Sequence, residues 1–521
     1  SNGGGVNPLV EPDYGIFKGA NLSRNQLGKK DELCFNCYDE NGDGYLDQDE
    51  LMKLKSDCEN PDRLLFIDID SKPRIIGFIK DLYDRAVNFL TNADKTKVYI
   101  DGQVITVNGM IESNQQGEIR DCWLLSKINA LAETDFGYED IKNSITSNKN
   151  GSYTVDIKKL NKKYTITQEE FQKAIDSGEY SSGDPDMILF ELALEKHYDK
   201  LLAKADKKAV KKGNSTISEI RTAAGNTHSI DGGTSVVGLK KKDFDNRDIM
   251  HLITGADTYC IVSKFGFDNV LDLKADNKNK IAMTFGSEYS ITVNEETGET
   301  KIIPFNETEY DDGAHEYTIK DVIKDESGNI VNIIVGNPWD SKQDIPISKS
   351  EFDKVAMDMN IAVKDKKLTK KIEDIDKKDY YAKLIQDANS LQDDFSIYNF
   401  QSTVGNTYDT RLFVGYSGGV NKLYQQYLEK VKDYTEGLDY GYKTNGIDGM
   451  NEYIGKEIWN PEDEEVKKYL DDFMSKPIEE RYLLNQKRFF ECIGFSEDEA
   501  NKIIQSPELL QEYCKKYDYI Y

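Results

Sequence analysis

One cysteine in the chain stands where a thiol could act as a nucleophile. In the stretch SNQQGEIRDCWLLSKINALAE, Ser113 to Glu133, Cys122 follows a short polar loop and precedes a run with helical spacing. Buried structural cysteines are inert, whereas a thiol at the first position of a helix gains thiolate character from the helix dipole. A cysteine nucleophile also needs a base and hydrogen-bond donors for the oxyanion. Cys122 is therefore a candidate nucleophile if the fold brings such partners to it.

One of the four histidines lies where a base could be oriented. His315 opens the strand-like segment HEYTIKDVI, and NIVNIIVGNPW follows after the turn KDESGN, 324–329. In an antiparallel hairpin centred on this turn, His315 and Asn337 face each other with Cβ atoms about 5 Å apart. The Asn337 side chain could then fix the imidazole, and Trp339 could cover the pair from water. A structural hairpin with an incidental histidine is the alternative.

The acidic segment DENGDGYLDQDE, 39–50, is a second candidate site. It fills the diagnostic positions of a 12-residue EF-hand calcium loop, including Gly44 at the sharp bend. The predicted calcium ligands are Asp39, Asn41, Asp43, Tyr45 (through its backbone carbonyl), Asp47 and Glu50. An acidic turn without a cation is the alternative. EF-hands usually pair, but TNGIDGMNEYIG, 444–455, lacks two required positions, so we interpret it as a turn.

Hydrophobic spacing predicts the elements that must hold these side chains. In order along the chain, they are a helix at 75–93, a hairpin at 97–109, a helix beginning at Cys122, a helix at 185–204, and short strands from about 256 to 363. The Lys-rich stretch ADKKAVKKGN after the third helix is interpreted as a solvated loop. From 365 onward the chain is charged and mostly helical, and Ser496 and Glu499 form a capping box.

Composition limits the partners that the chain can have. Its 521 residues are too many for one core, so two to four domains are expected. With 67 basic and 94 acidic residues the net charge is −27, which disfavours nucleic acid and favours calcium or a basic protein. No apolar stretch is long enough to predict a membrane span. Seven cysteines, including the CxxC pair Cys34 and Cys37, do not indicate a disulfide framework.

Location is left open by the sequence. The chain begins SNGGGVNPLV, without Met or a signal-like segment, which fits a processed or cloned start. An upstream signal peptide could have been removed, so a secreted or cell-surface location is slightly favoured over a cytoplasmic one.

Three short blocks, QGEIRDCWLLS, GAHEYTI and GNPWD, occur in this order and together resemble the calpain family of papain-like cysteine proteases. Weaker similarity to the same family is found at 190–201, 229–239 and 346–363. The resemblance covers about 104–364, roughly half of the chain. It implies an α+β fold with a papain-like two-lobed protease core, in which a helical lobe carries Cys122 and a β-rich lobe carries His315 and Asn337.

The resemblance also implies a role for each residue of the candidate site. Cys122 matches the nucleophile, His315 the general base, and Asn337 the residue that orients the imidazole. Gln116 matches the side-chain donor to the oxyanion, together with the backbone N–H of Cys122, and Trp339 matches the residue that shields the His–Asn bond. The implied reaction is hydrolysis of internal peptide bonds in a protein or peptide substrate through a thioester. Ca²⁺ in the EF-hand and no organic cofactor are expected.

The expected domain order follows from these assignments. It is a flexible tail at 1–22, an EF-hand module at 23–60, a connector at 61–103, protease subdomains at 104–230 and 231–365, and a mostly helical region at 366–521. The last region has no function that its sequence indicates, although an inhibitor or partner protein could bind there.

Two positions depart from the family pattern. Arg120 stands where the family has Gly before Asp-Cys, and its side chain could crowd the oxyanion loop or bring positive charge near the thiolate. Ser113, beside Glu112, stands where animal calpains have an Asp calcium ligand, so calcium switching within the protease core is not expected. The alternatives are an inactive calpain-like protein that binds partners in a calcium-dependent manner, and an acyltransferase of the transglutaminase type, which Asn337 disfavours.

Overall fold

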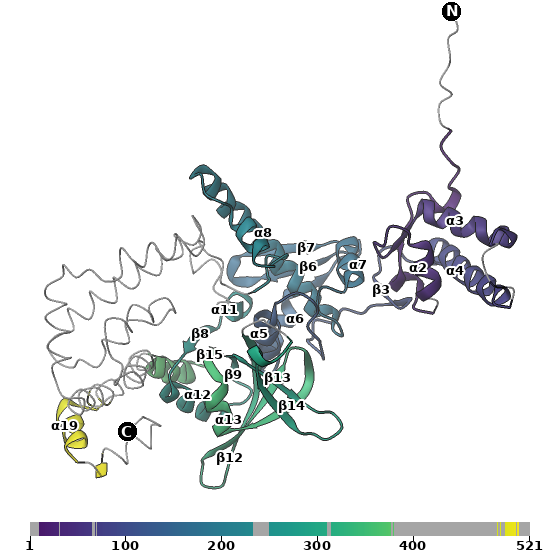
Figure 1. Cartoon of the computed structure of the whole chain (residues 1–521). Helices are drawn as coiled ribbons and strands as arrows, with labels where there is room; N and C mark the ends of the chain where they lie inside the picture. The colour runs from purple at the N-terminus through teal and green to yellow at the C-terminus, as the bar shows by residue number, and fades with distance from the viewer. Residues whose placement is uncertain are drawn as a thin grey trace, which may run out of the picture.

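The computed structural model describes residues 10–376, except 31, 65–67, 69, 233–248 and 310–313, and also residues 379, 487, 490, 495–506, 508 and 509. The described chain combines helices with antiparallel sheets, which confirms the predicted mixed α and β class (Figure 1). Most of 366–521 lies outside the described residues, including the turn at 444–455. Within it, α19 (Glu497–Gln505) has the predicted capping box. No helix in the described part is long and apolar enough to cross a membrane.

The N-terminal module consists of η1 (Gly15–Phe17), β1 (Asn21–Ser23), α1 (Arg24–Leu27), α2 (Glu32–Tyr38), β2 (Tyr45–Asp47), α3 (Gln48–Glu59), η2 (Pro61–Arg63) and α4 (Lys72–Asn92). One hydrophobic core joins these elements and buries Phe17, Leu22 and Leu82. The expected tail at 1–22 is therefore structured from about residue 15, because Phe17 and Leu22 complete this core. The helix expected as a connector, α4, also belongs to the module, because its apolar face lies against α2 and α3.

The acidic segment 39–50, the predicted calcium loop, has a pairing partner that the sequence did not reveal. β1 pairs antiparallel with β2, and Leu22 lies opposite Leu46. The Ser23–Gln26 capping box that follows β1 has the same spacing as the Asp47–Glu50 box that follows β2. Residues 15–26 thus occupy the place of a second loop while lacking its acidic ligands. A search for ligands missed this partner because strand pairing requires backbone groups only.

The middle of the chain forms a mainly helical half. Its elements are β3 (Tyr99–Ile100), β4 (Gln103–Val104), α5 (Cys122–Ala132), α6 (Asp135–Ser144), β5 (Ile145–Ser147), β6 (Tyr153–Ile157), η3 (Lys158–Leu160), β7 (Lys162–Ile166), α7 (Gln168–Ser177), α8 (Pro185–Lys211), α9 (Ile217–Ala223) and α11 (Ile249–Thr254). The predicted β3–β4 hairpin is confirmed, with φ of 52° at Asp101 and 78° at Gly102 in its turn. The core of this half includes Ile253 and Ala256, so it extends past the expected boundary at 230.

The Lys-rich stretch after residue 204 is helical rather than a loop. α8 continues to Lys211 and ends before Gly213, which has a φ of 71°. Alanine and lysine are good helix formers even where no apolar stripe is present, so the helix continues into solvent. The prediction was wrong because it used charge as the signal for a loop.

The remaining described chain forms a sheet half. Its elements are β8 (Asp257–Ile261), α12 (Lys264–Asp276), β9 (Ile281–Ser287), β10 (Tyr289–Val293), β11 (Thr300–Pro304), η5 (Phe305–Glu307), β12 (His315–Lys324), β13 (Ile330–Asn337), β14 (Asp340–Ser348), α13 (Lys349–Val355) and β15 (Ala356–Val363). Six strands form one antiparallel sheet in the order β14-β13-β12-β9-β15-β8. α12 was not predicted, although Phe267, Val270 and Leu271 bury one helical face in the sheet core.

Candidate active site

Cys122 is the first residue of α5, as predicted. The apolar side of this helix, including Leu124 and Ile128, is fully buried and fixes the helix against the rest of the core. The thiol-bearing residue itself is partly exposed, so a substrate could reach it. As the first helical residue, Cys122 also has a backbone N–H with no acceptor inside the helix. That N–H is available to a developing oxyanion.

The loop before Cys122 is attached to the segment that follows α7. Gln115 and Ser182 exchange two backbone hydrogen bonds of 3.0 and 2.9 Å, and Ile119 N donates to Glu179 O at 3.1 Å. Gly117 lies so close to this segment that an added Cβ would be 2.2 Å from the Tyr180 carbonyl oxygen. Only glycine fits there, which explains the Gln-Gly pair in the sequence.

Gln116 lies on this loop and faces the junction of the two halves. Its backbone N–H donates to Pro338 O at 2.8 Å, next to Asn337, and its side-chain Nε2 donates to Ile119 O at 2.9 Å. Because a side-chain amide has two donor hydrogens, one remains for another acceptor. The Gln116 Oε1 atom is buried and has no hydrogen-bond partner among the described residues. Gln116 therefore stays a candidate donor to an oxyanion, as the sequence predicts.

His315 and Asn337 are hydrogen-bonded, as the sequence predicted. The distance from His315 Nε2 to Asn337 Oδ1 is 2.9 Å, and both side chains are buried. Two further bonds fix the Asn337 amide, because its Nδ2 donates to Ile291 O at 3.0 Å and its Oδ1 accepts from Trp339 N at 3.0 Å. Because the atom that faces His315 Nε2 is the Asn337 Oδ1 acceptor, the imidazole must carry its hydrogen on Nε2. The imidazole therefore keeps Nδ1 unprotonated and able to accept a proton.

The register that brings the two residues together differs from the predicted one. Thr318 pairs with Gly336, so the residue opposite Asn337 is Tyr317 rather than His315. The shift is set at the turn, where Lys324 pairs with Ile330, and the two irregularities further along the β12–β13 pairing compensate each other. A shift of two keeps each side chain on its face, so His315 reaches Asn337 diagonally. The contact was predicted correctly, and the exact pairing was wrong.

Aromatic rings enclose the imidazole. The ring centroid of Trp339 lies 4.8 Å from that of His315, Tyr317 lies at 4.9 Å and Phe305 at 6.0 Å. The predicted cover by Trp339 is present, and Phe305 and Tyr317 extend it. Such a shell excludes water from the His315–Asn337 bond, which strengthens it.

Burial favours the neutral forms of both the Cys122 thiol and the His315 imidazole. It raises the pKa of Cys122 to about 12, with a further rise from the Glu316 carboxylate and an opposing effect of the Glu316 backbone N–H. Burial lowers the pKa of His315 to about 4, against the effect of the Asn337 bond. The expected thiolate is therefore not the resting form, because desolvation outweighs the helix dipole. The Glu316 N–H nevertheless places the sulfur beside β12, one residue from His315.

In the described part of the chain, no hydrogen bond joins the Cys122 sulfur to the His315 ring. An ion pair of the two groups requires that they approach, since each charged form would then stabilise the other. Of the predicted catalytic residues, the structure thus brings His315 to Asn337, and Gln116 to the segment after Asn337.

A buried ion pair that the sequence analysis missed connects the two halves. Lys127 Nζ lies 2.6 Å from Glu316 Oε2, and the Lys127 side chain is completely buried. Ser126 Oγ donates to Glu316 O at 2.8 Å, and Thr318 Oγ1 donates to Ser126 O at 2.7 Å. The helix that carries Cys122 is therefore fixed directly to the strand that begins with His315. A lysine among apolar residues in CWLLSKINALA was the signal that could have revealed it.

A second buried pair lies at the start of α5. Asp121 and Glu191 are both fully buried, and neither Asp121 oxygen has a hydrogen-bond partner among the described residues. Burial raises the pKa of Asp121, and the Glu191 charge raises it further. Glu191 also accepts from Ser181 N and Oγ. The Asp121 carboxyl also contributes to the raised pKa of the neighbouring Cys122 thiol.

The other three histidines are engaged elsewhere. His197 Nδ1 is bonded to Tyr164 OH, and His251 Nδ1 is bonded to the Ala256 carbonyl. His228 lies between Glu195 and Glu179, at 2.6 and 3.2 Å, in a loop of the helical half. His315 is the histidine whose partners suit a general base.

Arg120 does not fill the oxyanion loop. The residue is exposed, and its backbone accounts for its role in the loop: its N–H donates to Asp231 Oδ1 at 2.8 Å, and its carbonyl accepts from Gly232 N at 2.9 Å. The Gly-Gly segment expected at 229–239 is described only up to Gly232. An arginine is tolerated at this position because the residue is exposed.

The acidic loop has the backbone arrangement of a calcium loop. Asp39 accepts from the N–H groups of Asp43 and Gly44 at 3.1 and 2.9 Å, and Asn41 Oδ1 accepts from Asp43 N at 2.9 Å. Asp43 Oδ1 in turn accepts from Tyr45 N at 2.9 Å. These bonds turn three predicted ligand side chains toward the inside of the loop.

The closing carboxylate of the loop has other partners. Glu50 accepts from Glu40 N at 2.8 Å and from Asp47 N at 3.0 Å, and burial raises its pKa. Within the described ranges, no three acidic, His or Cys side chains converge closely enough to hold a metal ion. The residue types and the loop fold fit Ca²⁺, and Glu50 would exchange two amide bonds for the ion.

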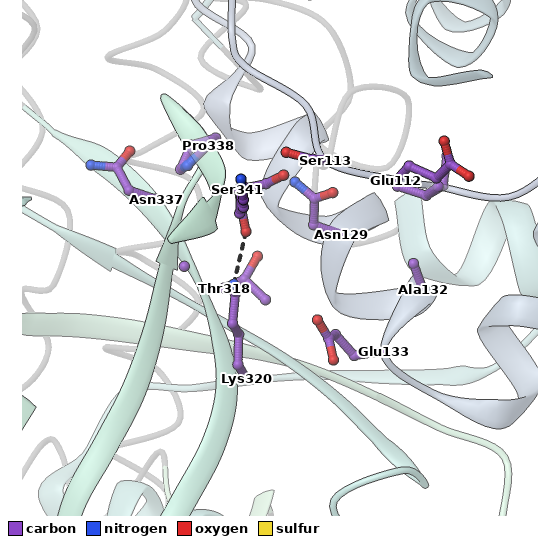
Figure 2. A pocket seen from close by; sticks show the side chains of 13 residues that line it. Glu112, Ser113, Asn129, Ala132, Glu133, Thr318, Lys320, Asn337, Pro338 and Ser341 are labelled. Atoms are coloured by element: carbon purple, nitrogen blue, oxygen red, sulfur yellow. Dashed lines mark hydrogen bonds between the residues drawn. The ribbon is translucent and has the colours of Figure 1, made fainter. Parts of the chain in front are cut away.

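A cavity of about 310 Å³ separates the C-terminal half of α5 from the sheet half. Figure 2 shows Asn129 of α5 and Glu133, which follows α5, on one side, Asn337 and Pro338 on the other, and Lys320 below. Neither the candidate nucleophile nor the candidate base lines it. The cavity thus lies behind the Asn337 side of the site and is not a cleft at the thiol.

Comparison with protein-family models and with curated proteins finds no match for this chain.

Proposed function

We propose that this protein is a calcium-binding, calpain-like cysteine endopeptidase with a papain-like two-lobed core. The helical half would be the Cys lobe and the sheet half the His/Asn lobe. The observation that carries the proposal is the His315–Asn337 bond of 2.9 Å, fixed by Ile291 and Trp339 and enclosed by aromatic rings. It leaves Nδ1 of His315 as a base on the strand against which the Cys122 sulfur lies.

The proposed reaction assigns one step to each group. The His315 imidazole accepts the thiol proton as the two lobes bring it to Cys122, and the thiolate attacks a peptide carbonyl to form a thioester. Gln116 Nε2 and the Cys122 N–H stabilise the oxyanion. His315 then protonates the leaving amine, and water hydrolyses the thioester. Asn337 keeps the ring oriented throughout.

Casein digestion with product sequencing, with calcium and with EGTA, tests the class of reaction. We expect new N-termini inside the substrate chain. Pretreatment with a peptide chloromethyl ketone should abolish digestion and should modify Cys122 but not Cys260, which lies in β8. Amine incorporation into casein without cleavage would instead indicate acyl transfer.

An inactive calcium-dependent binding protein is the second candidate. It is favoured by the raised pKa of Cys122 and the lowered pKa of His315, and by the absence of a hydrogen bond between these two groups in the described structure. Iodoacetamide distinguishes the two candidates. In a protease, substrate-like peptides bring thiol and imidazole together and alter the rate at which Cys122 reacts. In a binding protein, Cys122 reacts slowly and its rate does not respond to such peptides.

Replacing Asn337 by alanine should lower turnover more than substrate affinity. The substitution removes the acceptor that orients His315 and leaves groups that contact substrate in place, so kcat should fall by about 10²-fold while KM changes little. Steady-state kinetics on a peptide substrate measure the two terms separately. Asn332→Ala on the exposed side of β13 is the matched control and should behave as wild type. Equal losses in both variants would contradict the orienting role.

Replacing Glu50 by glutamine should abolish most of the stabilisation by calcium. Calcium at about a hundred times its dissociation constant should stabilise the wild-type module by about 2.7 kcal/mol, and Glu50→Gln weakens the bidentate contact that closes the shell. Asp49→Asn removes the same charge at a loop position that is not a ligand and should keep the effect. Thermal melts of the three proteins with calcium and with EGTA measure it. A calcium shift that survives in Glu50→Gln would refute this site.

A further inference from the structure

The side chain of Tyr45 extends from the calcium loop to the helical half. Its hydroxyl donates to Asp176 Oδ2 at 2.9 Å, and Asp176 belongs to α7. Asn25, at the start of α1, donates to Oδ1 of the same carboxylate at 2.8 Å. Figure 1 shows α7 and β3 at the side of the helical half that faces the module. One carboxylate therefore binds two elements of the module to the helical half.

Asp176 is also held by its own half. Gln172, one turn earlier in α7, donates to Asp176 Oδ1 at 2.9 Å. The same amide bonds both the N–H and the carbonyl of Tyr99 in the β3–β4 hairpin. The turn of this hairpin reaches the module as well, because Gly102 N donates to Asn25 O at 2.6 Å. These bonds make the junction a continuous network rather than a single surface contact.

A short path leads from Asp176 to the candidate oxyanion loop. α7 ends at Ser177, and the next residues, 179–182, form the segment to which the loop before Cys122 is bonded. Ile119 N donates to Glu179 O at 3.1 Å, and Gly117 is in close contact with the carbonyl of Tyr180. A displacement of the C-terminal end of α7 would thus move the loop that carries Gln116.

We infer that calcium bound at 39–50 regulates the candidate active site through the Tyr45–Asp176 hydrogen bond. The inference rests on the proposed function, since it takes up both calcium binding and proteolysis. Residue 7 of the loop binds calcium through its backbone carbonyl, and that residue is Tyr45. The ion therefore fixes the backbone from which the Tyr45 ring projects to Asp176, and α7 conveys the constraint to Gln116.

The helical half does not need calcium to hold its own loops. Asp186 Oδ1 accepts from Gly109 N at 2.8 Å, and Asp184 Oδ2 accepts from Glu112 N at 2.9 Å. Backbone amides thus satisfy the carboxylates beside the loop in which Ser113 replaces the family's calcium ligand. We therefore place the action of calcium in the module, with α7 as the element that connects Tyr45 to the loop before Cys122.

Tyr45→Phe in the full chain tests the path without removing a calcium ligand. Phenylalanine keeps the backbone carbonyl and loses only the hydroxyl. The matched control is Tyr14→Phe, which loses a phenol bond of 2.5 Å to Asp49 inside the same module. Two ratios are measured. The first is the dissociation constant of a peptide aldehyde at Cys122 in EGTA divided by its value in calcium. The second is the dissociation constant of calcium without the aldehyde divided by its value with the aldehyde. The two ratios must be equal if the sites are coupled.

In the wild type and in Tyr14→Phe, we expect calcium to tighten aldehyde binding by about 5-fold or more. The aldehyde should tighten calcium binding by the same factor. In Tyr45→Phe both factors should fall to about one, while calcium affinity without aldehyde stays within about 3-fold of wild type because the ligand is a carbonyl. Asn25→Asp replaces a donor to Asp176 by a second carboxylate, which repels it, and should also reduce both factors to about one. Coupling that survives in both variants would overturn the inference.

The inference and the proposed function fail in different ways. If the wild type binds calcium and cleaves casein, but neither calcium nor the aldehyde changes the affinity for the other, the coupling alone is refuted. A wild type that binds no calcium by calorimetry, or that cleaves nothing and binds no aldehyde, would refute the proposed function and the inference with it.

Discussion

Cys122→Ala should abolish peptide-bond cleavage and leave the fold intact. Alanine cannot form the thioester, so only oxyanion donors and substrate binding remain, and kcat/KM should fall by at least about 10⁴-fold. The residue is partly exposed and the substitution keeps its Cβ, so the melting temperature should change little. Casein digestion and thermal melting of the same preparation measure the two outcomes together.

The specificity of this loss is tested by other substitutions of the same kinds. Cys260→Ala should digest casein as the wild type does. His315→Ala should be as inactive as Cys122→Ala, whereas His251→Ala should keep its activity, because its ring is bonded to a backbone carbonyl away from the site. A Cys122→Ala protein that still cleaves casein would rule out a cysteine protease. An active His315→Ala with an inactive His251→Ala would show that the base is misassigned.

The elements around the site were predictable because each depends on local chemistry. The helix beginning at Cys122 follows from apolar spacing, and the β3–β4 turn follows from Asp101-Gly102, which tolerate positive φ. The contact of His315 with Asn337 was also predictable, since both lie on one face of a hairpin. Its register was not, because the turn is placed so that Lys324 pairs with Ile330, and the sequence of the turn does not fix that position.

The electrostatics of the site depend on packing that sequence spacing does not reveal. A helix start predicts a lower thiol pKa, but the surroundings of Cys122 desolvate it and raise its pKa to about 12. Lys127 and Glu316 lie 189 residues apart and meet only because α5 is placed against β12. Likewise, Tyr45 and Asp176 are 131 residues apart, in different parts of the fold. Contacts of this kind require the tertiary structure.

The Lys127–Glu316 pair supports the second large prediction, which concerns stability. The Lys127 side chain is fully buried, and burial raises the pKa of Glu316 to about 7 even beside it. Lys127→Ala leaves a buried carboxylate without its partner, so the free energy of unfolding should fall by about 3–5 kcal/mol. Lys196→Ala is the contrasting control, because its pair with Glu170 is half-exposed and should contribute about 0–1 kcal/mol.

Removing both charges separates the cost of an unpaired charge from the contribution of the pair. In Lys127→Met with Glu316→Met, no charge remains between α5 and β12, so most of the loss in Lys127→Ala should be recovered. Urea unfolding of the three variants and the wild type measures these differences through the midpoint and slope. Activity gives an independent readout, since α5 carries Cys122 and β12 begins with His315: Lys127→Ala should also lower kcat where the protein is still folded. If Lys127→Ala cost no more than Lys196→Ala, water would have to reach this pair, and the two halves would not be fixed to each other at the candidate site.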